Sequence, residues 1–409
     1  MLGRHIAIVA PPVPGHYDPL KVLARALEAK GHRVTFVHMF DAGALLDGFG
    51  FGFCAVGARS HGPGALRRYT DILARAARPL GFLAMIRATA AVTRMLLDEL
   101  PDALAAIGAD AVIADSTEPA GGLVARHLRL PWASSVTGLP LLREPSVPPP
   151  FIGWPFGHDD ASLKRNETGY RISDWLSRPI DRVLRERGER WGLDPAEHGG
   201  FSSALQVTQC PPGLDFPRQE LPEVFHYTGP WRAPVQAIKA PQSDRPLVYC
   251  SLGSLQGNRP ALFAAMSEAC SRVGARAVVA HGGRLRDERL PGDPIVRARW
   301  DQPSIVPHCS AAILHGGFNT VLDALTAGVP MLLRPIAFEQ PGTAARVVHH
   351  GAGRLLTGRI SAARIAEALA GVLASNELRG GARRFADEMS ALGGVERAAD
   401  LIDALFRRS

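Results

Sequence analysis

The 409-residue sequence has few cysteines and no long apolar run. These two features argue against a disulfide-stabilised protein and against a membrane-spanning protein. The five cysteines are scattered and odd in number, and none forms a Cys-x-x-Cys pair. Structural disulfides and a zinc site are therefore not expected, and the cytoplasm is the expected compartment. No cofactor is expected either. No run approaches the roughly 20 apolar residues of a membrane span, and the first ten residues do not resemble a signal peptide.

Positive charge exceeds negative charge, with 46 Lys and Arg against 39 Asp and Glu, and arginine supplies most of the excess. A basic protein can bind nucleic acid, an anionic membrane surface or an anionic substrate. The sequence contains no zinc finger, no basic recognition helix and no alternation of aromatic and basic residues. Nucleic acid is therefore not an expected partner, which leaves an anionic substrate or surface.

Apolar runs rich in β-branched residues alternate with amphipathic stretches, which is typical of parallel α/β units. The length suits two domains of about 200 residues each. The first series predicts strands at 5–10, 33–38, 111–114, 132–136 and 205–208, and helices at 17–30, 64–107 (broken near Pro79) and 174–191. The second series predicts strands at 247–250, 277–280, 311–314 and 330–333.

A proline-rich stretch, residues 211–243, separates the two series and predicts a linker with one short strand at 225–228. We expect a first domain of residues 1–233 including linker, a second of 234–385, and a C-terminal helix within 386–409 that returns to the first. In open α/β sheets the ligand lies beyond the carboxyl ends of the strands, where the strand order reverses. Two such sheets facing each other would form a cleft with the donor in one half and the acceptor in the other.

The loop after the first predicted strand carries a histidine that is suited to act as a base. Gly15 permits a sharp turn, and His16 follows it where a helix begins. Histidine can deprotonate an alcohol near neutral pH. Asp115, at the carboxyl end of the strand at 111–114, is placed to hold the ring in one tautomer. The alternatives are that His16 only caps its helix and that Asp115 only caps the helix that follows it.

A glycine turn in the second half has the composition of a phosphate-binding site. The predicted strand at 311–314 runs into a His-Gly-Gly turn and then into a helix. Such glycines let backbone N–H groups approach phosphate oxygens, and the helix N-terminus adds partial positive charge. Plain packing of the turn is the alternative. The candidate diphosphate ligands are His315, Gly316, Gly317, Asn319 and Thr320, and Asp323 is a candidate acceptor for ribose hydroxyls.

Two further segments of the second half fit a sugar nucleotide. Glu339 and Gln340 set a carboxylate beside an amide, which offers acceptors and donors to the hydroxyls of a hexose. Ser254 lies in the loop after the first strand of this domain and can donate to phosphate, although a serine in an ordinary turn would look the same. The order and spacing of these elements together predict a diphosphate and sugar site.

An apolar acceptor is expected in the first domain. Residues 139–158 offer Phe151, Trp154 and Phe156 among prolines, which suits an apolar ligand, and a proline-stiffened surface loop is the alternative. The predicted helical residues 66–97 set arginines beside many apolar residues, which predicts contact with an anionic membrane that holds the acceptor. A solvated helix face is the simpler explanation of these arginines, which are Arg67, Arg68, Arg75, Arg78, Arg87 and Arg94.

The segment from Trp300 to Gln340 resembles the donor-binding signature of the UDP-glycosyltransferase superfamily, and the resemblance extends from the His16 loop to the C-terminus. Within it, the likeness is to bacterial zeaxanthin glucosyltransferases. The supporting strings are residues 115–122, 143–150, 251–257, 280–283 and 337–342. The resemblance implies a GT-B fold, two Rossmann-like α/β domains facing across a cleft. It also implies inversion at the sugar carbon, no metal, and transfer of glucose from UDP-glucose to a hydroxyl of a lipophilic acceptor.

The resemblance also assigns roles to residues. His16 matches the base and Asp115 its orienting acid, while Asp323 matches a ribose binder that is often Glu. His315, Asn319 and Thr320 match diphosphate binders, and Glu339 and Gln340 match the sugar binders.

The usual Trp-x-Pro-Gln of the family is altered to Arg299-Trp300-Asp301-Gln302. Gln302 keeps its spacing to His315, but Trp300, which should stack on uracil, lies one place nearer the glutamine. This change makes the sequence less specific for UDP, relative to dTDP, as the predicted donor nucleotide. A glycosyltransferase for a polyketide or macrolide and a catalytically silent GT-B homologue acting as a binding partner are the two alternatives, and the intact His16–Asp115 pair disfavours the second.

Overall fold

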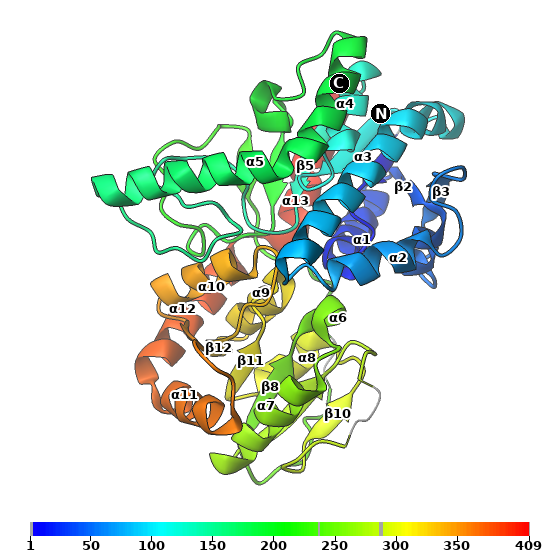
Figure 1. Cartoon of the computed structure of the whole chain (residues 1–409). Coiled ribbons are helices and arrows are strands. Elements are labelled where there is room, and N and C mark those ends of the chain that lie inside the picture. The colour runs from blue at the N-terminus through cyan, green and yellow to red at the C-terminus, as the bar shows by residue number, and fades with distance from the viewer. Residues whose placement is uncertain (1–2, 236–237, 286–288, 409) are drawn as a thin grey trace.

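The computed structural model describes residues 3–235, 238–285 and 289–408. They form two α/β domains, and each is built on a parallel sheet covered by helices. In Figure 1 the first domain is at the top and the second at the bottom. All strand pairs in both sheets are parallel apart from one isolated bridge outside the named strands. The central strands of each sheet are buried on both faces, which explains why they are largely apolar runs.

Within the described residues the first sheet has seven strands in the order β3-β2-β1-β4-β5-β6-β7. Strand order reverses between β1 and β4, which pair with Ala7 opposite Val112. The strands are β1 (His5–Val9), β2 (Arg33–Met39), β3 (Gly52–Val56), β4 (Ala111–Asp115), β5 (Trp132–Val136), β6 (Gln206–Thr208) and β7 (Phe225–Tyr227).

Helices cover both faces of this sheet. The core beneath them is a single cluster of apolar side chains that includes β1, α1 and the end of the chain. The helices are α1 (Pro14–Ala29), α2 (Ala65–Leu73), α3 (Pro79–Ile107), α4 (Pro119–His127) and α5 (Asp160–Trp191), with 3-10 turns η1 (Phe40–Leu46) and η2 (Glu197–Gly200).

The second sheet has the order β10-β9-β8-β11-β12-β13 in the described residues, with its reversal between β8 and β11. Its strands are β8 (Leu247–Ser251), β9 (Arg276–Ala280), β10 (Ile295–Arg297), β11 (Ala311–Leu314), β12 (Met331–Leu333) and β13 (Gly353–Leu355). Its helices are α6 (Gly253–Gln256), α7 (Pro260–Arg272), α8 (Gln302–Ile305), η3 (Val306–His308), α9 (Phe318–Thr326), α10 (Gln340–His349), α11 (Ala362–Ala374) and α12 (Asn376–Ala391).

The last helix, α13 (Gly394–Arg408), crosses back to the first domain and packs on α1. Ile402 and Phe406 are fully buried in the core of that domain. Polar contacts fix the docking, since His32 Nε2 lies 2.8 Å from Asp403 Oδ1. The preceding helix, α12, packs on α9 and stays with the second domain. The two domains are therefore joined by the linker after β7 and by α13.

Two expectations from sequence are corrected by these elements. The helix predicted over 174–191 begins fourteen residues earlier, because Asp159 caps it by accepting from the Ser162 N–H at 3.0 Å. Within the described chain one helix, α3, is long and apolar enough by length and composition to cross a membrane, whereas no such run was expected. Its C-terminal half, from Ala90 on, packs into the core of the first domain, and 33% of its most apolar 18-residue window is buried.

Candidate active site between the two sheets

His16 and Asp115 lie at the carboxyl ends of β1 and β4, the two strands that flank the reversal point of the first sheet. His16 is in the first turn of α1, directly after β1, and Asp115 is the last residue of β4. Pro14 begins the helix, where its fixed φ angle suits the first turn and its missing N–H costs nothing. His16 Nδ1 lies 3.1 Å from Asp115 Oδ2. The pair that the sequence predicted therefore forms by direct contact.

A third residue completes this contact and was not predicted from sequence. The Thr137 hydroxyl, just after β5, donates to Asp115 Oδ2 at 2.7 Å and lies 2.7 Å from His16 Nδ1. Because the Asp115 carboxylate can only accept and the Thr137 proton is already given to it, the His16 Nδ1 must carry the proton. The Nε2 atom is then the unprotonated nitrogen, and it is the atom that can act as a base.

The capping alternatives do not describe these side chains. The N-cap of α1 is Val13 and that of α4 is Glu118, and neither helix has a side-chain cap. Asp115 Oδ1 instead accepts from the N–H of Thr117 at 3.0 Å and from its hydroxyl at 2.6 Å. Four polar groups therefore contact the two carboxylate oxygens of Asp115, and they fix the orientation of its side chain.

The surroundings of His16 favour its charged form on balance. Burial is the largest single influence and lowers the pKa of His16, but the carboxylates around the ring, Asp115 first among them, together raise that pKa above its ordinary value. Glu339, from the second domain, adds to this effect, which places its carboxylate near the ring. Burial acts to raise the pKa of Asp115, but His16 and the two threonines lower it. Asp115 is therefore ionised at neutral pH and supports a proton on the ring.

The glycine turn of the second domain occupies the corresponding reversal point. His315, Gly316 and Gly317 follow β11, and Gly317 is the N-cap of α9. A Cβ at Gly317 would lie 2.5 Å from His315 Nε2, so a side chain there would displace the buried His315 ring. The loop after β8 runs alongside, since β8 and β11 pair and a Cβ at Gly253 would lie 2.7 Å from the same nitrogen. The first N–H groups of α9 therefore lie beside a tightly packed glycine turn at the carboxyl edge of the sheet, which is an arrangement suited to binding phosphate.

His315 differs from His16 in charge. Burial lowers the pKa of His315 to about 4, so its ring is neutral at pH 7. Its Nδ1 atom is buried and has no hydrogen-bond partner among the described residues. A buried unpaired ring nitrogen beside a helix N-terminus fits a site that is completed by a ligand. His315 can supply a hydrogen bond to an anion there, but not a full positive charge.

The first two turns of α9 present Asn319 and Asp323 toward the first domain. The Asn319 Nδ2 donates at 2.6 Å to the carbonyl of Gly15, the residue before His16. Asp323 is buried and accepts from Arg232 Nε at 2.6 Å. Burial raises the pKa of Asp323, and Arg232 acts in the opposite direction. The loop that bears His16 and the helix that follows His315 therefore touch each other. Thr320, the third predicted residue on this helix, is buried.

The loop with Glu339 and Gln340 closes the same site from β12. Phe338 has a φ of 59°, which is unusual for a residue with a side chain, and it turns the chain into α10. The Gln340 Oε1 accepts from the N–H groups of Ile336 and Ala337, both at 2.9 Å, so the loop is held from within. Glu339 is partly exposed, and burial raises its pKa while His16 lowers it. The strained loop thus presents a carboxylate near the imidazole of the other domain.

Ser254, Trp300 and Gln302 lie around the same sheet edge. Ser254 is in α6, and Gln302 is the first residue of α8. The Trp300 Nε1 donates to the Val279 carbonyl at 3.1 Å, and the Arg297 guanidinium lies 4.0 Å from its ring centroid. One part of the indole is therefore occupied by protein contacts, and its stacking on a base stays a prediction.

The three aromatic residues predicted for the acceptor lie in the loop before α5. Phe151 is 49% exposed, whereas Trp154 packs against Gly169 of α5. Phe156 stacks on Phe216, with ring centroids 5.3 Å apart, and also meets His349 of α10. Phe156 and Trp154 thus contribute to packing between elements, and the acceptor role of all three stays a prediction.

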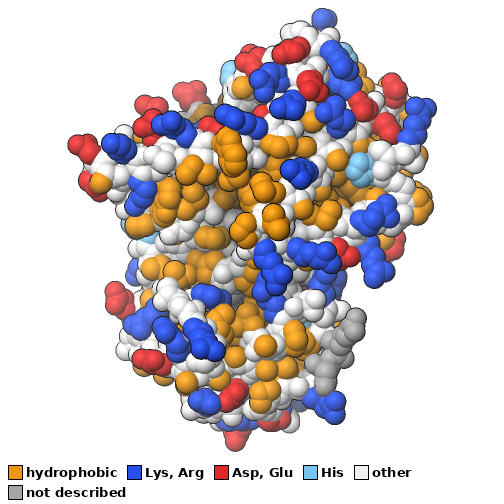
Figure 2. All heavy atoms as spheres, in the orientation of Figure 1, with side chains coloured by type: hydrophobic (Ala, Val, Ile, Leu, Met, Phe, Trp, Pro, Cys, Tyr) orange, Lys and Arg blue, Asp and Glu red, His pale blue; other side chains and the backbone are white. Residues whose placement is uncertain are grey.

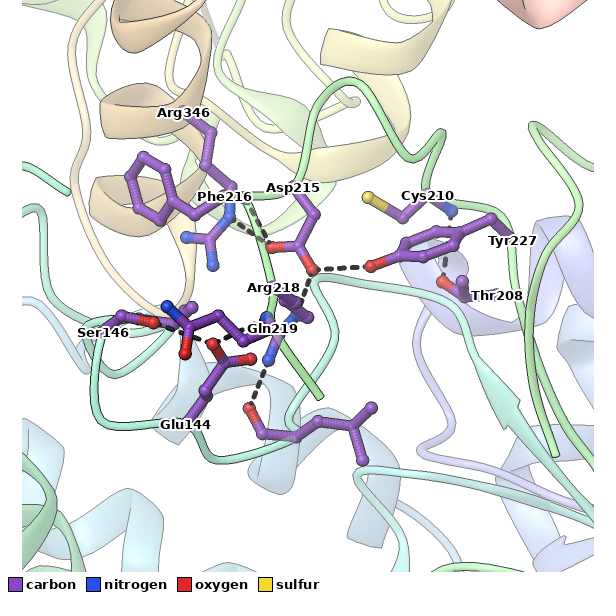
Figure 3. Close-up of polar contacts among 12 residues, drawn as sticks. Glu144, Ser146, Thr208, Cys210, Asp215, Phe216, Arg218, Gln219, Tyr227 and Arg346 are labelled. Atoms are coloured by element: carbon purple, nitrogen blue, oxygen red, sulfur yellow. Dashed lines mark hydrogen bonds and ion pairs between the residues drawn. The ribbon is translucent and has the colours of Figure 1, made fainter. Parts of the chain in front are cut away.

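A buried ion cluster fastens α10 to the acceptor side of the interface (Figure 3). Asp215, in the loop after β6, accepts from Arg346 of α10 at 3.0 Å and from Arg218 at 2.6 Å. Arg218 also donates to the Leu142 carbonyl at 2.9 Å. Burial acts to raise the pKa of Asp215, but the two guanidiniums lower it below its ordinary value. Removing Asp215 would leave two buried guanidiniums without their carboxylate. The cluster therefore holds the helix that begins at Gln340 against residues 139–150.

Among the residues described, no group of three or more His, Cys, Asp and Glu side chains is arranged to hold a metal ion. The site consists instead of a histidine–aspartate–threonine group facing a glycine turn and a helix N-terminus.

Comparison with known proteins gives the family. A model of the family described as "UDP-glucoronosyl and UDP-glucosyl transferase" matches residues 213–384. A zeaxanthin glucosyltransferase of Pantoea ananas is 39% identical over 98% of this chain and 96% of its own. Another, of Pseudescherichia vulneris, is 35% identical over 98% and 97%.

The chain belongs to this glycosyltransferase family. Solved structures agree on the fold. The calicheamicin glycosyltransferase CalG4 superposes with a TM-score of 0.77 at 24% identity, covering 100% of this chain and 99% of that one. The GT-B architecture expected from sequence is therefore confirmed.

Proposed function

We propose that this glycosyltransferase is inverting and metal-independent and moves glucose from UDP-glucose to a hydroxyl of a lipophilic acceptor, a hydroxylated carotenoid such as zeaxanthin. The acceptor and the sugar are favoured by the two relatives named zeaxanthin glucosyltransferase, which align over almost the whole chain. The observation that carries the mechanism is the contact between the two halves of the site. The His16 loop touches α9 through Gly15 and Asn319, so a base and a diphosphate site share one space.

The transfer is a single displacement. The His16 Nε2 takes the proton of the acceptor hydroxyl, and Asp115 with Thr137 holds the ring and stabilises the charge that it gains. The acceptor oxygen forms a bond to the anomeric carbon of the α-linked sugar while the bond from that carbon to the phosphate oxygen breaks. The electron pair leaves with UDP, and the product is a β-glycoside.

The second domain stabilises the leaving group. The N–H groups at the start of α9 and the neutral ring of His315 donate to the diphosphate, with Ser254 and Thr320 as further donors. Asp323 accepts from the ribose, Trp300 and Gln302 lie toward the base, and Glu339 with Gln340 binds the glucose. Because these donors are fixed before the reaction, they cost little reorganisation as charge develops. No metal has a step in this mechanism.

The acceptor enters from the face formed by α3 and α5, and this face rests on a membrane surface. Exposed apolar side chains on the two helices support this, since Leu80 is 82% exposed and Trp175 is 58% exposed. Figure 2 shows hydrophobic side chains gathered over the first domain, with Lys and Arg beside them. The six arginines named in residues 66–97 are all exposed. Apolar and cationic groups together suit an anionic lipid surface.

The test is a transfer assay. Purified protein is incubated with UDP-glucose, UDP-galactose or dTDP-glucose and with zeaxanthin or a macrolide aglycone, and the products are identified by mass spectrometry. We expect a mass gain of one or two hexoses on zeaxanthin with UDP-glucose, and a β-linkage by NMR. Absence of any glycoside with every pair, from folded protein, would overturn the proposal.

A natural-product glycosyltransferase of another kind is the second candidate. A demethyllactenocin mycarosyltransferase of Streptomyces fradiae is 28% identical over 98% of this chain. The shifted Trp300 also favours weaker selection for uracil. Transfer to the macrolide aglycone from dTDP-glucose, without transfer to zeaxanthin, would support this candidate.

A further inference from the structure

Two residues outside the family's donor signature lie between the base and the donor helix. Gln209 follows β6, and Arg232 follows β7 in the linker. Gln209 is fully buried, and Arg232 has a side chain that is 20% exposed. Neither residue belongs to a motif that the sequence singled out. We call this pair the Gln209–Arg232 clamp.

Gln209 bonds to both halves of the site. Its Nε2 donates to the Thr137 carbonyl at 2.5 Å and to Asn319 Oδ1 at 2.8 Å. Thr137 contacts His16 through its hydroxyl, and Asn319 returns to the His16 loop by donating to Gly15. The contacts therefore form a closed ring from the catalytic loop through β5, β6 and α9 and back. A shift of α9 relative to the first domain has to break this ring.

Arg232 binds Asp323 and the backbone of α9. It donates to Asp323 Oδ1 at 2.6 Å, to the Asn319 carbonyl at 3.0 Å and to Gln209 Oε1 at 3.1 Å. Its neighbour Trp231 is fully buried in the core of the first domain, so the guanidinium is anchored at its base. Asp323 is buried. The guanidinium opposes the rise in the Asp323 pKa that burial causes, and it binds Oδ1 of the carboxylate.

We propose that Gln209 and Arg232 are positioning residues for the sugar transfer: they hold Asn319 and Asp323 ready for a nucleoside diphosphate and tie that face of α9 to the loop that carries His16. This inference rests on the proposed function, because it assumes a ribonucleotide at α9. Arg232 sets how strongly Asp323 recognises the ribose, and Gln209 sets the distance between donor and base.

The first test measures nucleotide binding without catalysis. UDP and 2′-deoxy-UDP are titrated by calorimetry into the wild type, Arg232→Met and Arg232→Lys, with Arg245→Met as a matched arginine control on the surface. We expect Arg232→Met to weaken UDP binding on the order of 10- to 100-fold, because a charged hydrogen bond is lost. The loss for 2′-deoxy-UDP should be smaller, and Arg232→Lys should recover part of the affinity.

The second test measures turnover. Gln209→Leu is compared with Gln206→Leu. Gln206 is a buried glutamine of β6, the strand just before Gln209, and its Nε2 donates to the Ser202 carbonyl at 2.9 Å. We expect Gln209→Leu to lower kcat about tenfold with a smaller change in the KM for UDP-glucose, and Gln206→Leu to leave kcat within about twofold. Thermal unfolding of each variant is measured alongside.

The outcomes separate the clamp from the proposed function. If the wild type binds UDP and transfers glucose, and the clamp variants do so equally well, the clamp proposal is wrong and the proposed function stands. An equal loss of UDP and 2′-deoxy-UDP binding in Arg232→Met, with no recovery in Arg232→Lys, shows a merely structural arginine and also overturns the clamp proposal. Wild-type protein that binds neither nucleotide overturns the proposed function, and the clamp with it.

Discussion

The two sheets place one histidine each at their reversal points, and the two histidines have opposite electrostatics. His16, after β1, faces Asp115 and has a raised pKa. His315, after β11, is buried without a partner for Nδ1 among the described residues, and its pKa falls to about 4. The same residue type in the same topological position thus has a raised pKa beside a carboxylate in one domain and is kept neutral by burial in the other. What differs is the carboxylate: Asp115 contacts the His16 ring, whereas no carboxylate of the described residues influences the pKa of His315.

Removing His16 should cause the largest loss of activity. His16→Ala should lower kcat by about 10²–10⁴-fold, because the imidazole that takes the acceptor's proton is lost. UDP affinity should stay unchanged, since the base does not hold the nucleotide. Steady-state kinetics and calorimetry check the two halves of this prediction, with His308→Ala, an exposed histidine, as control. Near-full activity in folded His16→Ala protein discards the assignment.

Removing the other histidine should show the complementary pattern. His315→Ala should lower kcat by about 10²–10³-fold, because one fixed donor to the developing charge on UDP is lost. UDP binding should weaken as well, unlike in His16→Ala. The same two measurements check this. If His315→Ala leaves UDP binding and turnover intact, the glycine turn is only a packing feature.

Removing the carboxylate should make His16 resemble His315. In the wild type the acid limb of kcat/KM should have its midpoint above the ordinary histidine pKa of 6.5, since Asp115 raises the pKa of His16 and the base must be neutral. In Asp115→Asn burial acts without that opposition, so the midpoint should move to lower pH. Activity at pH 7 should fall on the order of 10²-fold, because the ring is no longer held in one tautomer. An identical midpoint in both proteins, from pH–rate profiles, would refute the pairing.

The smallest expected effect concerns the surface of the first domain alone. Leu80→Ser combined with Trp175→Ser should reduce binding to vesicles of anionic phospholipid by roughly tenfold, because apolar area no longer enters the lipid. Leu355→Ser, an exposed apolar residue on β13, serves as the control. Sedimentation with vesicles measures both. Equal partitioning of all three proteins argues against a membrane-facing surface.

The central elements of the fold were predictable because buried parallel strands are continuous apolar runs. β5 and β11 occur at the residues expected, and β1 and β4 differ by one residue at an end. The short strands β3, β10 and β13 were missed. They lie at or near the sheet edges, and several of their side chains are exposed, so their sequences lack the apolar run that marks a central strand.

The positions of His16 and His315 in turns after strands were predictable, whereas the residues that contact these turns were not. His16 and His315 follow strands and sit beside glycines, which is a local signal. Thr137, Gln209 and Arg232 acquire their places only when distant strands and the two domains come together. The one signal that could have found them is position, since each follows a strand of the first sheet at its carboxyl end.

The most direct test is a crystal structure of the protein with UDP and zeaxanthin or a shorter hydroxylated analogue. The account predicts the diphosphate at the N-terminus of α9, in contact with His315, and the acceptor hydroxyl about 2.6–3.2 Å from His16 Nε2. A nucleotide bound away from the turn after β11, or an acceptor hydroxyl on a different surface from His16, would contradict it.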